Sequence, residues 1–195
     1  MLQSARAAGA LGPGPVGAHL DHAEGLAAMI GAPPARFVDL GSGGGVPGLV
    51  LACRWPAAEA VLVEVMARRC RLLESAVGVL GLANCRVVEA RAEEVGRDPS
   101  HRGAYDLVAA RSFGPPAVTA ECAAPFLTMG GRLLVAEPPE PDPARWPDAG
   151  LAQLGLGPAV ADRRGDVAAV LITKVAPTAD RWPRRTGIPS KRPLW

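Results

Sequence analysis

The sequence lacks the residue patterns of several common classes of protein. Its four cysteines form no CxxC pair and have no closely spaced histidine partner; they are Cys53, Cys70, Cys85 and Cys122. This spacing argues against a zinc site and a disulfide framework and favours reduced, mostly buried thiols. No Ser/His/Asp or Cys/His set typical of nucleophilic catalysis is evident, and no internal repeat indicates a solenoid.

Long apolar runs are also missing. No stretch approaches 18 uninterrupted apolar residues, and the first residues do not combine a basic segment with an apolar run. The sequence therefore predicts neither a membrane span nor a secretion signal, and we expect a cytoplasmic protein without a metal site. With 195 residues, 49% hydrophobic and 21% charged, the chain is long enough for one domain with an ordinary core.

Short apolar strands alternate with helices along most of the chain. Residues 1–17 are small and rich in Gly and Pro, which predicts a flexible lead before a domain over 18–180. Strands are predicted at 36–40, 60–65, 85–90, 105–110, 132–136 and 167–172. Helices are predicted at about 18–31, 47–54, 67–80 and 115–127, and a proline-rich surface loop at 137–150. This order is typical of an α/β, Rossmann-like fold with a mostly parallel sheet flanked by helices.

The first predicted strand runs into a glycine loop, Asp39-Leu40-Gly41-Ser42-Gly43-Gly44-Gly45-Val46-Pro47-Gly48. Glycines 41, 43 and 45 remove side chains where backbone must pass close to a ligand, and the following helix offers unpaired N–H groups to a carboxylate. Residues 43–48 also fit the G-x-G-x-x-G dinucleotide template, so the loop leaves a nicotinamide or flavin enzyme open.

Three acids favour S-adenosylmethionine as the ligand. Asp39 precedes the loop and can hold the cationic methionine amine, and Glu64 near the end of the second strand can accept two ribose hydroxyls. Glu93 follows the third strand, near the expected adenine. Each role is a charged or bidentate hydrogen bond that an apolar residue could not supply.

Four segments then carry a resemblance to a known family. They are Phe37 to Gly48, Arg91-Ala92-Glu93-Glu94, Ala110-Arg111-Ser112, and Arg184-Arg185-x-Gly187-x-Pro189-x-Lys191-Arg192-Pro193-Leu194. Over about residues 18–195 the chain resembles the GidB/RsmG-type methyltransferases, which modify a guanine at ring nitrogen seven of bacterial small-subunit rRNA. The resemblance implies a class I S-adenosylmethionine-dependent fold and cofactor contacts at Gly41, Val46, Ala92, Glu93 and Arg111. To these the loop and acid arguments add Asp39, Gly43, Gly45 and Glu64.

The sequence departs from that family at two places. Family members begin with a longer helical segment, and they tend to place Lys-Gly after the fifth strand, where this chain has Glu137-Pro138. An anion there weakens the expectation of binding to phosphate-rich RNA and keeps open a small-molecule methyltransferase or a non-catalytic cofactor- or RNA-binding protein. His19-Leu20-Asp21-His22 is similar to the family's His-x-x-Asp element, and a capped or solvated helix is preferred there over a metal site.

A basic tail over residues 181–195 suggests an anionic partner, because it carries five cations and no acid. We expect small-subunit rRNA or the ribosomal subunit, with phosphate contacts at Arg184, Arg185, Lys191 and Arg192. The alternative is an extension that packs through Trp182, Ile188 and Trp195 while its charges face water. No catalytic residue is assigned, because methylation of an unprotonated ring nitrogen requires no general base; Arg111 is the candidate for shaping the site.

Overall fold

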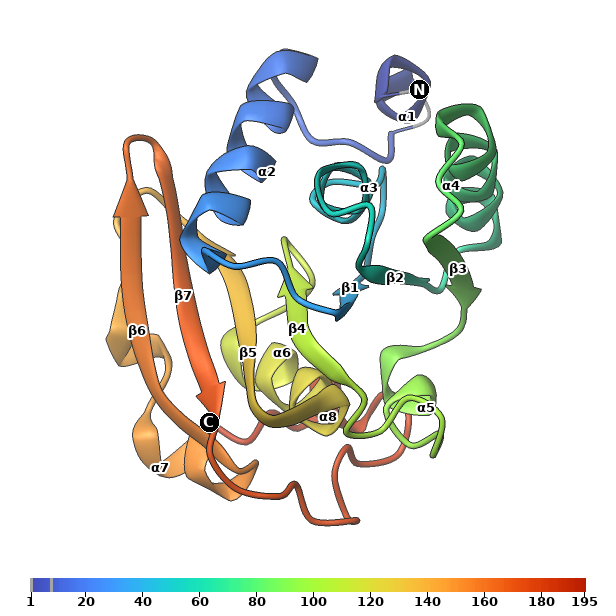
Figure 1. Ribbon diagram of the computed structural model, residues 1–195. Helices are drawn as coiled ribbons and strands as arrows, with labels where there is room; N and C mark the ends of the chain where they lie inside the picture. Colours follow the sequence, from blue (N-terminus) through green and yellow to red (C-terminus); the bar gives the residue numbers. More distant parts are fainter. Residues whose placement is uncertain (1, 8) are drawn as a thin grey trace.

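A seven-stranded sheet is the centre of the computed structural model, which describes residues 2–7 and 9–195. The strand order is β3-β2-β1-β4-β5-β7-β6 (Figure 1). The first five strands run parallel: β1 (Arg36–Leu40), β2 (Glu59–Glu64), β3 (Cys85–Glu89), β4 (Tyr105–Ala110) and β5 (Leu127–Glu137). The last two, β6 (Leu156–Arg164) and β7 (Val167–Lys174), form an antiparallel hairpin that pairs with β5 through β7. This topology confirms the predicted α/β class.

Helices cover both faces of the sheet, as Figure 1 shows. One face packs against α2 (Val16–Ile30), α3 (Gly48–Arg54) and α4 (Ala67–Leu80); the other against α5 (Ala92–Val95), α6 (Pro116–Ala123) and α7 (Asp148–Gln153). Successive strand residues point to opposite faces, so Phe37 joins the first core and Val38 the second. Burial on both faces explains why these strands are continuous apolar runs that the sequence reveals.

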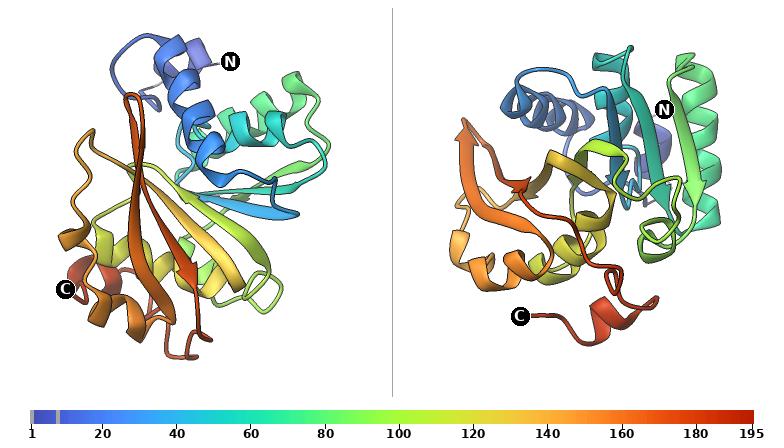
Figure 2. Two further views of the ribbon diagram at one scale, coloured as in Figure 1. Left: turned by 60° about the vertical axis from the view of Figure 1, so that its left-hand side comes forward. Right: turned by 60° about the horizontal axis from the view of Figure 1, so that its bottom comes forward.

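The edge strand β6 was not predicted, and β5 is longer than predicted. β6 contains residues that are uncommon in strands, including Pro158 and the charged residues 162–164, and much of the strand is exposed. The formation of β6 therefore depends on its pairing with β7 more than on its own residues. The two strands form the long hairpin at the edge of the sheet in Figure 2. In β5 the pair Gly130-Gly131 looks like a turn in sequence, yet the strand continues through it with an irregular register against β4.

The N-terminal residues also differ from the predicted flexible lead. Residues Leu2–Ala7 form α1, with Leu2 and Ala5 buried, and Leu2 packs in a small cluster with Ala23 and Val46. Two apolar residues three positions apart face the same side of a helix, which gives this short segment a packing surface. Residues 1 and 8 of the predicted lead lie outside the described residues.

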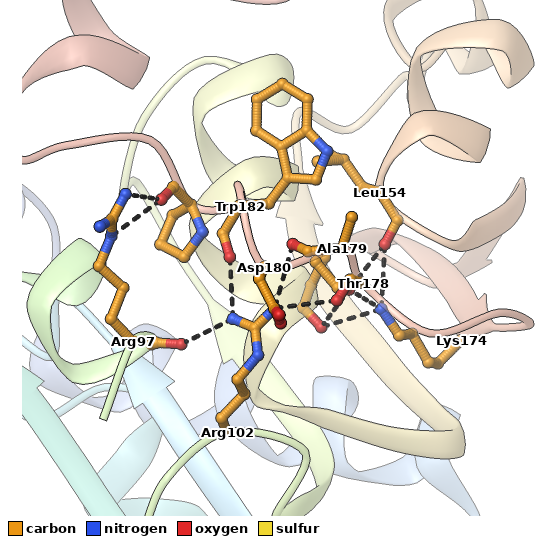
Figure 3. A network of polar contacts seen from close by, with 11 residues as sticks. Arg97, Arg102, Leu154, Lys174, Thr178, Ala179, Asp180 and Trp182 are labelled. Atoms are coloured by element: carbon orange, nitrogen blue, oxygen red, sulfur yellow. Dashed lines mark hydrogen bonds and ion pairs between the residues drawn. The ribbon is translucent and has the colours of Figure 1, made fainter. Parts of the chain in front are cut away.

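The C-terminal segment after β7 is attached to the domain by partly buried polar contacts (Figure 3). Arg102 donates to the carbonyl oxygens of Trp182 at 2.8 Å and Thr178 at 2.9 Å, and Arg97 Nε donates to that of Pro183 at 3.0 Å. The Lys174 ammonium at the end of β7 donates to the Thr178 hydroxyl of this segment, and burial lowers the pKa of Lys174 to about 8. The segment then runs under the sheet to a short helix, α8 (Ile188–Lys191), seen in the right-hand view of Figure 2.

Most of the cysteines are buried, as their spacing suggested. The four cysteines are free thiols, and all but Cys53 are buried. Within residues 2–7 and 9–195, no helix is long and apolar enough to cross a membrane.

Candidate active site

Three adjoining cavities open at the carboxyl ends of β1, β2, β4 and β5, where parallel α/β sheets bind ligands. The tail-side cavity lies between the glycine loop, the β3–α5 turn and α8; the loop-side cavity lies between the glycine loop and residues 9–12. The β5-end cavity lies between the β4 turn and the residues that follow β5. Ser112 borders all three and has a φ of 54°, which is unusual for a residue with a side chain.

The glycine loop is held by its backbone, and three of its glycines, Gly41, Gly43 and Gly44, border the cavities. Gly41 and Ser42 donate to the Val63 carbonyl at 2.9 and 3.1 Å, which ties the loop to the end of β2. Gly41 has a φ of +67° and borders both the tail-side and the loop-side cavity; a Cβ there would come within 2.8 Å of the Phe113 ring. Gly43 borders the loop-side cavity, as does Val46.

Gly45, predicted to contact the cofactor, lies away from the cavities and against α3. It borders none of the three cavities, and a Cβ on it would lie 2.3 Å from a methyl carbon of Leu49 in α3. Its φ of +90° also requires glycine. The need for glycine at this position therefore comes from its backbone conformation and from the close packing of the loop on α3.

Glu64 is the best placed of the predicted acids. Its side chain is 3% exposed and borders the tail-side cavity. Oε1 accepts the amides of Val65 and Met66 at 2.8 and 2.9 Å, and Oε2 accepts the Gly43 amide at 2.9 Å. A carboxylate offers about four acceptor positions, so Oε2 retains capacity for a hydroxyl donor from a ligand.

Asp39 lies beneath the loop and not at a cavity wall. It is 1% exposed, its Oδ2 accepts the Gly48 amide at 3.1 Å, and its Oδ1 has no hydrogen-bond partner among the described residues. Burial raises the pKa of Asp39 to about 7, because charge is costly without solvent or a paired cation. The predicted direct contact with an amine at this residue thus stays an inference from sequence.

Glu93 connects the β3–α5 turn to the tail. Ala92 and Glu93 both border the tail-side cavity, and Glu93 Oε1 accepts the Gly187 amide at 2.9 Å. Ser190 of α8 also borders this cavity, so the C-terminal segment contributes to one of its walls, called the tail wall below. The sequence did not predict this wall. A glycine within a run of charges was a signal for an ordered turn, and Gly187 has a φ of +79° in the structure.

Arg111 lies between the loop-side and β5-end cavities, in contact with His19 of α2. Its Nη2 lies 2.8 Å from His19 Nδ1, so Nδ1 is the acceptor and His19 Nε2 carries the proton toward the Gly12 carbonyl, 3.2 Å away. Arg111 Nη1 and His22 Nδ1 are buried without partners in the described part of the chain. Burial and the nearby guanidinium lower the pKa of His22, which keeps that ring neutral. No group of three potential metal ligands occurs among residues 2–7 and 9–195.

The tail cations differ in their availability. Arg184 donates from its amide, Nε and Nη2 to the Glu121 carboxylate at 2.9, 2.9 and 2.6 Å, and the Glu121 side chain is fully buried. Its charge is therefore already paired, which argues against the predicted phosphate contact at Arg184. The side chains of Arg185, Lys191 and Arg192 are exposed.

Comparison with known proteins gives a consistent result. Residues 19–138 match the family model GidB, described as rRNA small subunit methyltransferase G. A ribosomal RNA small subunit methyltransferase G of Symbiobacterium thermophilum is 38% identical over 90% of this chain and 76% of its own length; that of Roseiflexus castenholzii is 40% identical over 83% and 71%.

Solved structures show the same fold. A SAM-dependent methyltransferase from Aquifex aeolicus superposes with a TM-score of 0.66 over 90% of this chain and 99% of its own, at 15% identity. A T. thermophilus 16S rRNA N2 G1207 methyltransferase, solved with AdoMet and guanosine, gives 0.54 over 82% of this chain and 40% of its own, at 23% identity. The chain therefore belongs to the GidB family of S-adenosylmethionine-dependent methyltransferases.

Proposed function

We propose that the protein transfers a methyl group from S-adenosylmethionine to ring nitrogen seven of a guanine in bacterial small-subunit rRNA. The observation that carries this proposal is the continuous hollow over the glycine loop, where the tail-side and loop-side cavities share Gly41 and Ser112. Each cavity is about 290 Å³, so together they suit an elongated ligand such as a nucleoside with an amino-acid arm.

The residues at these cavities fit the cofactor. Gly41 borders both cavities without a side chain that could enter them, and the Glu64 carboxylate can accept from a ribose. Ala92 and Glu93 would contact the adenine end, and Gly43, Val46 and Arg111 would contact the amino-acid end. Asp39, whose Oδ1 has no hydrogen-bond partner within residues 2–7 and 9–195, would favour a cation nearby. The bound cofactor supplies an electrophilic methyl group.

The acceptor chemistry requires little from the protein besides position. Nitrogen seven of guanine carries no proton and has an available lone pair, so alignment and exclusion of water are enough to promote transfer. The names of the relatives support an rRNA substrate. So do the exposed Arg185, Lys191 and Arg192, which lie on the segment that borders the tail-side cavity and can contact phosphates.

The test is transfer of radiolabelled methyl groups to three acceptors: small subunits from cells that lack this modification, naked small-subunit rRNA, and a pool of metabolites. We expect label in one guanine of the rRNA, which borohydride and aniline cleavage would map as a nitrogen-seven product. Label in metabolites would identify a small-molecule methyltransferase instead. Cofactor binding without any transfer would indicate a non-catalytic protein.

A further inference from the structure

The β5-end cavity adjoins the tail-side cavity and contains an unusual carboxylate. Its volume is about 290 Å³, and it shares Ser112, Phe113 and Gly114 with the tail-side cavity. Its walls include the rings of His22, Phe113 and Trp146. A flat, partly aromatic ligand in this space would lie directly beside the methyl donor.

The carboxylate is that of Glu137, the last residue of β5. Its side chain is 3% exposed and borders the cavity. Oε1 accepts the indole N–H of Trp146 at 3.0 Å, and Oε2 is paired with the Arg145 guanidinium. Both donors come from the segment that follows β5, so the carboxylate is held in one orientation. Two of its roughly four acceptor positions are filled, and a ligand can use the others.

We propose that this cavity holds the acceptor nucleobase and that Glu137 selects guanine by accepting hydrogen bonds from its N1–H and 2-amino groups. The inference rests on the proposed function and adds the residue that reads the base. A carboxylate accepts hydrogen bonds and cannot donate them, so it favours an edge with two adjacent donors. Guanine presents two adjacent donors on its pairing edge, whereas adenine and uracil each place an acceptor beside a donor.

The placement of Glu137 also suits the position of the methylated atom. Nitrogen seven belongs to the five-membered ring of guanine, on the side of the purine remote from the N1 edge. Glu137 ends β5, whereas the shared residues Ser112 to Gly114 follow β4, the neighbouring strand. A purine between them can present its pairing edge to Glu137 and its five-membered ring to the cofactor side. Recognition of an unpaired base through its pairing edge is general in enzymes that modify bases.

The experiment measures binding of guanosine, inosine and adenosine 5′-monophosphates to the protein saturated with S-adenosylhomocysteine, by ligand-observed NMR. Inosine monophosphate differs from the guanosine nucleotide by the missing 2-amino group, and all three carry the same phosphate. We expect the guanosine nucleotide to bind about tenfold more tightly than the other two, the scale of a lost charge-assisted hydrogen bond. Glu137→Gln should reduce this preference to less than about threefold.

Glu140→Gln is the matched control, because Glu140 is an exposed acid in the same loop and borders none of the three cavities. It should keep the parent preference. Equal binding of the guanosine and inosine nucleotides to the parent protein would overturn the proposal, and this comparison needs no folded variant. A preference that survives in Glu137→Gln would also overturn it. If the nucleotides behave as expected while small subunits accept no methyl group, the rRNA assignment fails and the base-reading role stands.

Discussion

The two walls of the tail-side cavity are built in different ways. The glycine-loop wall is a nearly continuous piece of chain, in which Gly41 and Ser42 bond to the Val63 carbonyl and Glu64 accepts backbone amides. The tail wall is joined to the domain by carboxylates distant in sequence, with Glu93 on the Gly187 amide and Glu121 on Arg184. The first wall therefore depends on backbone shape, and the second on buried charge.

Gly41→Val should have the largest effect, because it changes the shape of the first wall. A Cβ at this position lies 2.8 Å from the Phe113 ring, and a β-branched residue strongly disfavours a φ of +67°. We expect calorimetry to show at least about 100-fold weaker binding of S-adenosylhomocysteine, given a strain of roughly 1–3 kcal/mol in addition to blocked space. Gly78→Val is the control, since Gly78 lies in α4 with open space around it. Parent-like affinity in Gly41→Val would mean that the ligand binds elsewhere.

Arg184→Gln tests the charged attachment of the second wall. It leaves the fully buried Glu121 carboxylate without its guanidinium. Loss of one partner from a buried pair costs about 3–5 kcal/mol, and partial exposure of Arg184 reduces the expected loss of unfolding free energy to about 2–3 kcal/mol. Urea denaturation measures this loss of unfolding free energy. Arg181→Gln, an exposed cation in the same segment, should change stability by less than about 0.5 kcal/mol. Equal effects of the two variants would show that the Glu121 pair does not hold the tail.

Asp39→Asn tests the glycine-loop wall through the pH dependence of stability. Burial raises the pKa of Asp39 to about 7, so the folded protein holds a proton that the unfolded chain releases near pH 4. Stability from this group is present below about pH 4 and is lost as the pH rises through 7. The free energy of unfolding of the cofactor-free Asn variant should thus exceed that of the parent by about 4 kcal/mol at pH 8.5 and match it near pH 4. The same difference at both pH values would contradict an Asp39 that titrates near 7.

The exposed tail cations should have the smallest effect on stability. Replacing Arg185, Lys191 and Arg192 with Gln removes charges that face solvent, so the unfolding free energy should change by less than about 0.5 kcal/mol. If these cations contact phosphates, the salt dependence of rRNA binding should become shallower by about 2–3 units of log–log slope. Filter binding at several salt concentrations measures it, with Arg181→Gln as the control. An unchanged slope would restrict the tail to its role as a cavity wall.

The difference between the walls also explains what the sequence could predict. The positions of Gly41 and Glu64 beside a cavity could be predicted from sequence. A strand that runs into a glycine turn, followed by the end of the next strand, is enough to indicate a ligand site. Gly45 was predicted as a cofactor contact from the same glycine spacing. In the structure a side chain at this position would collide with Leu49, and glycine spacing alone does not distinguish such packing from ligand contact.

The tail could not be placed in this way, because its position depends on partners far along the chain. In sequence, a run of cations suggests a free nucleic-acid-binding surface unless the acidic residues that pair with those cations are known. Glu121, the partner of Arg184, lies 63 residues earlier in the chain. The strand β6 was missed for a related reason, since its pairing with β7 outweighs the weak strand preference of its own residues. Glu137 was noticed as an anion in an unexpected place, and its contacts with Arg145 and Trp146 required the structure.

The position of the tail wall has a consequence for the order of synthesis. Residues 184–190 follow all seven strands in the chain, so a ribosome makes them after the glycine loop and the sheet. Domains begin to fold from the N-terminal side during translation, and here the sheet can form while part of the tail-side cavity wall is still absent. The emerging protein therefore completes the tail-side cavity only when Ser190 has left the ribosome.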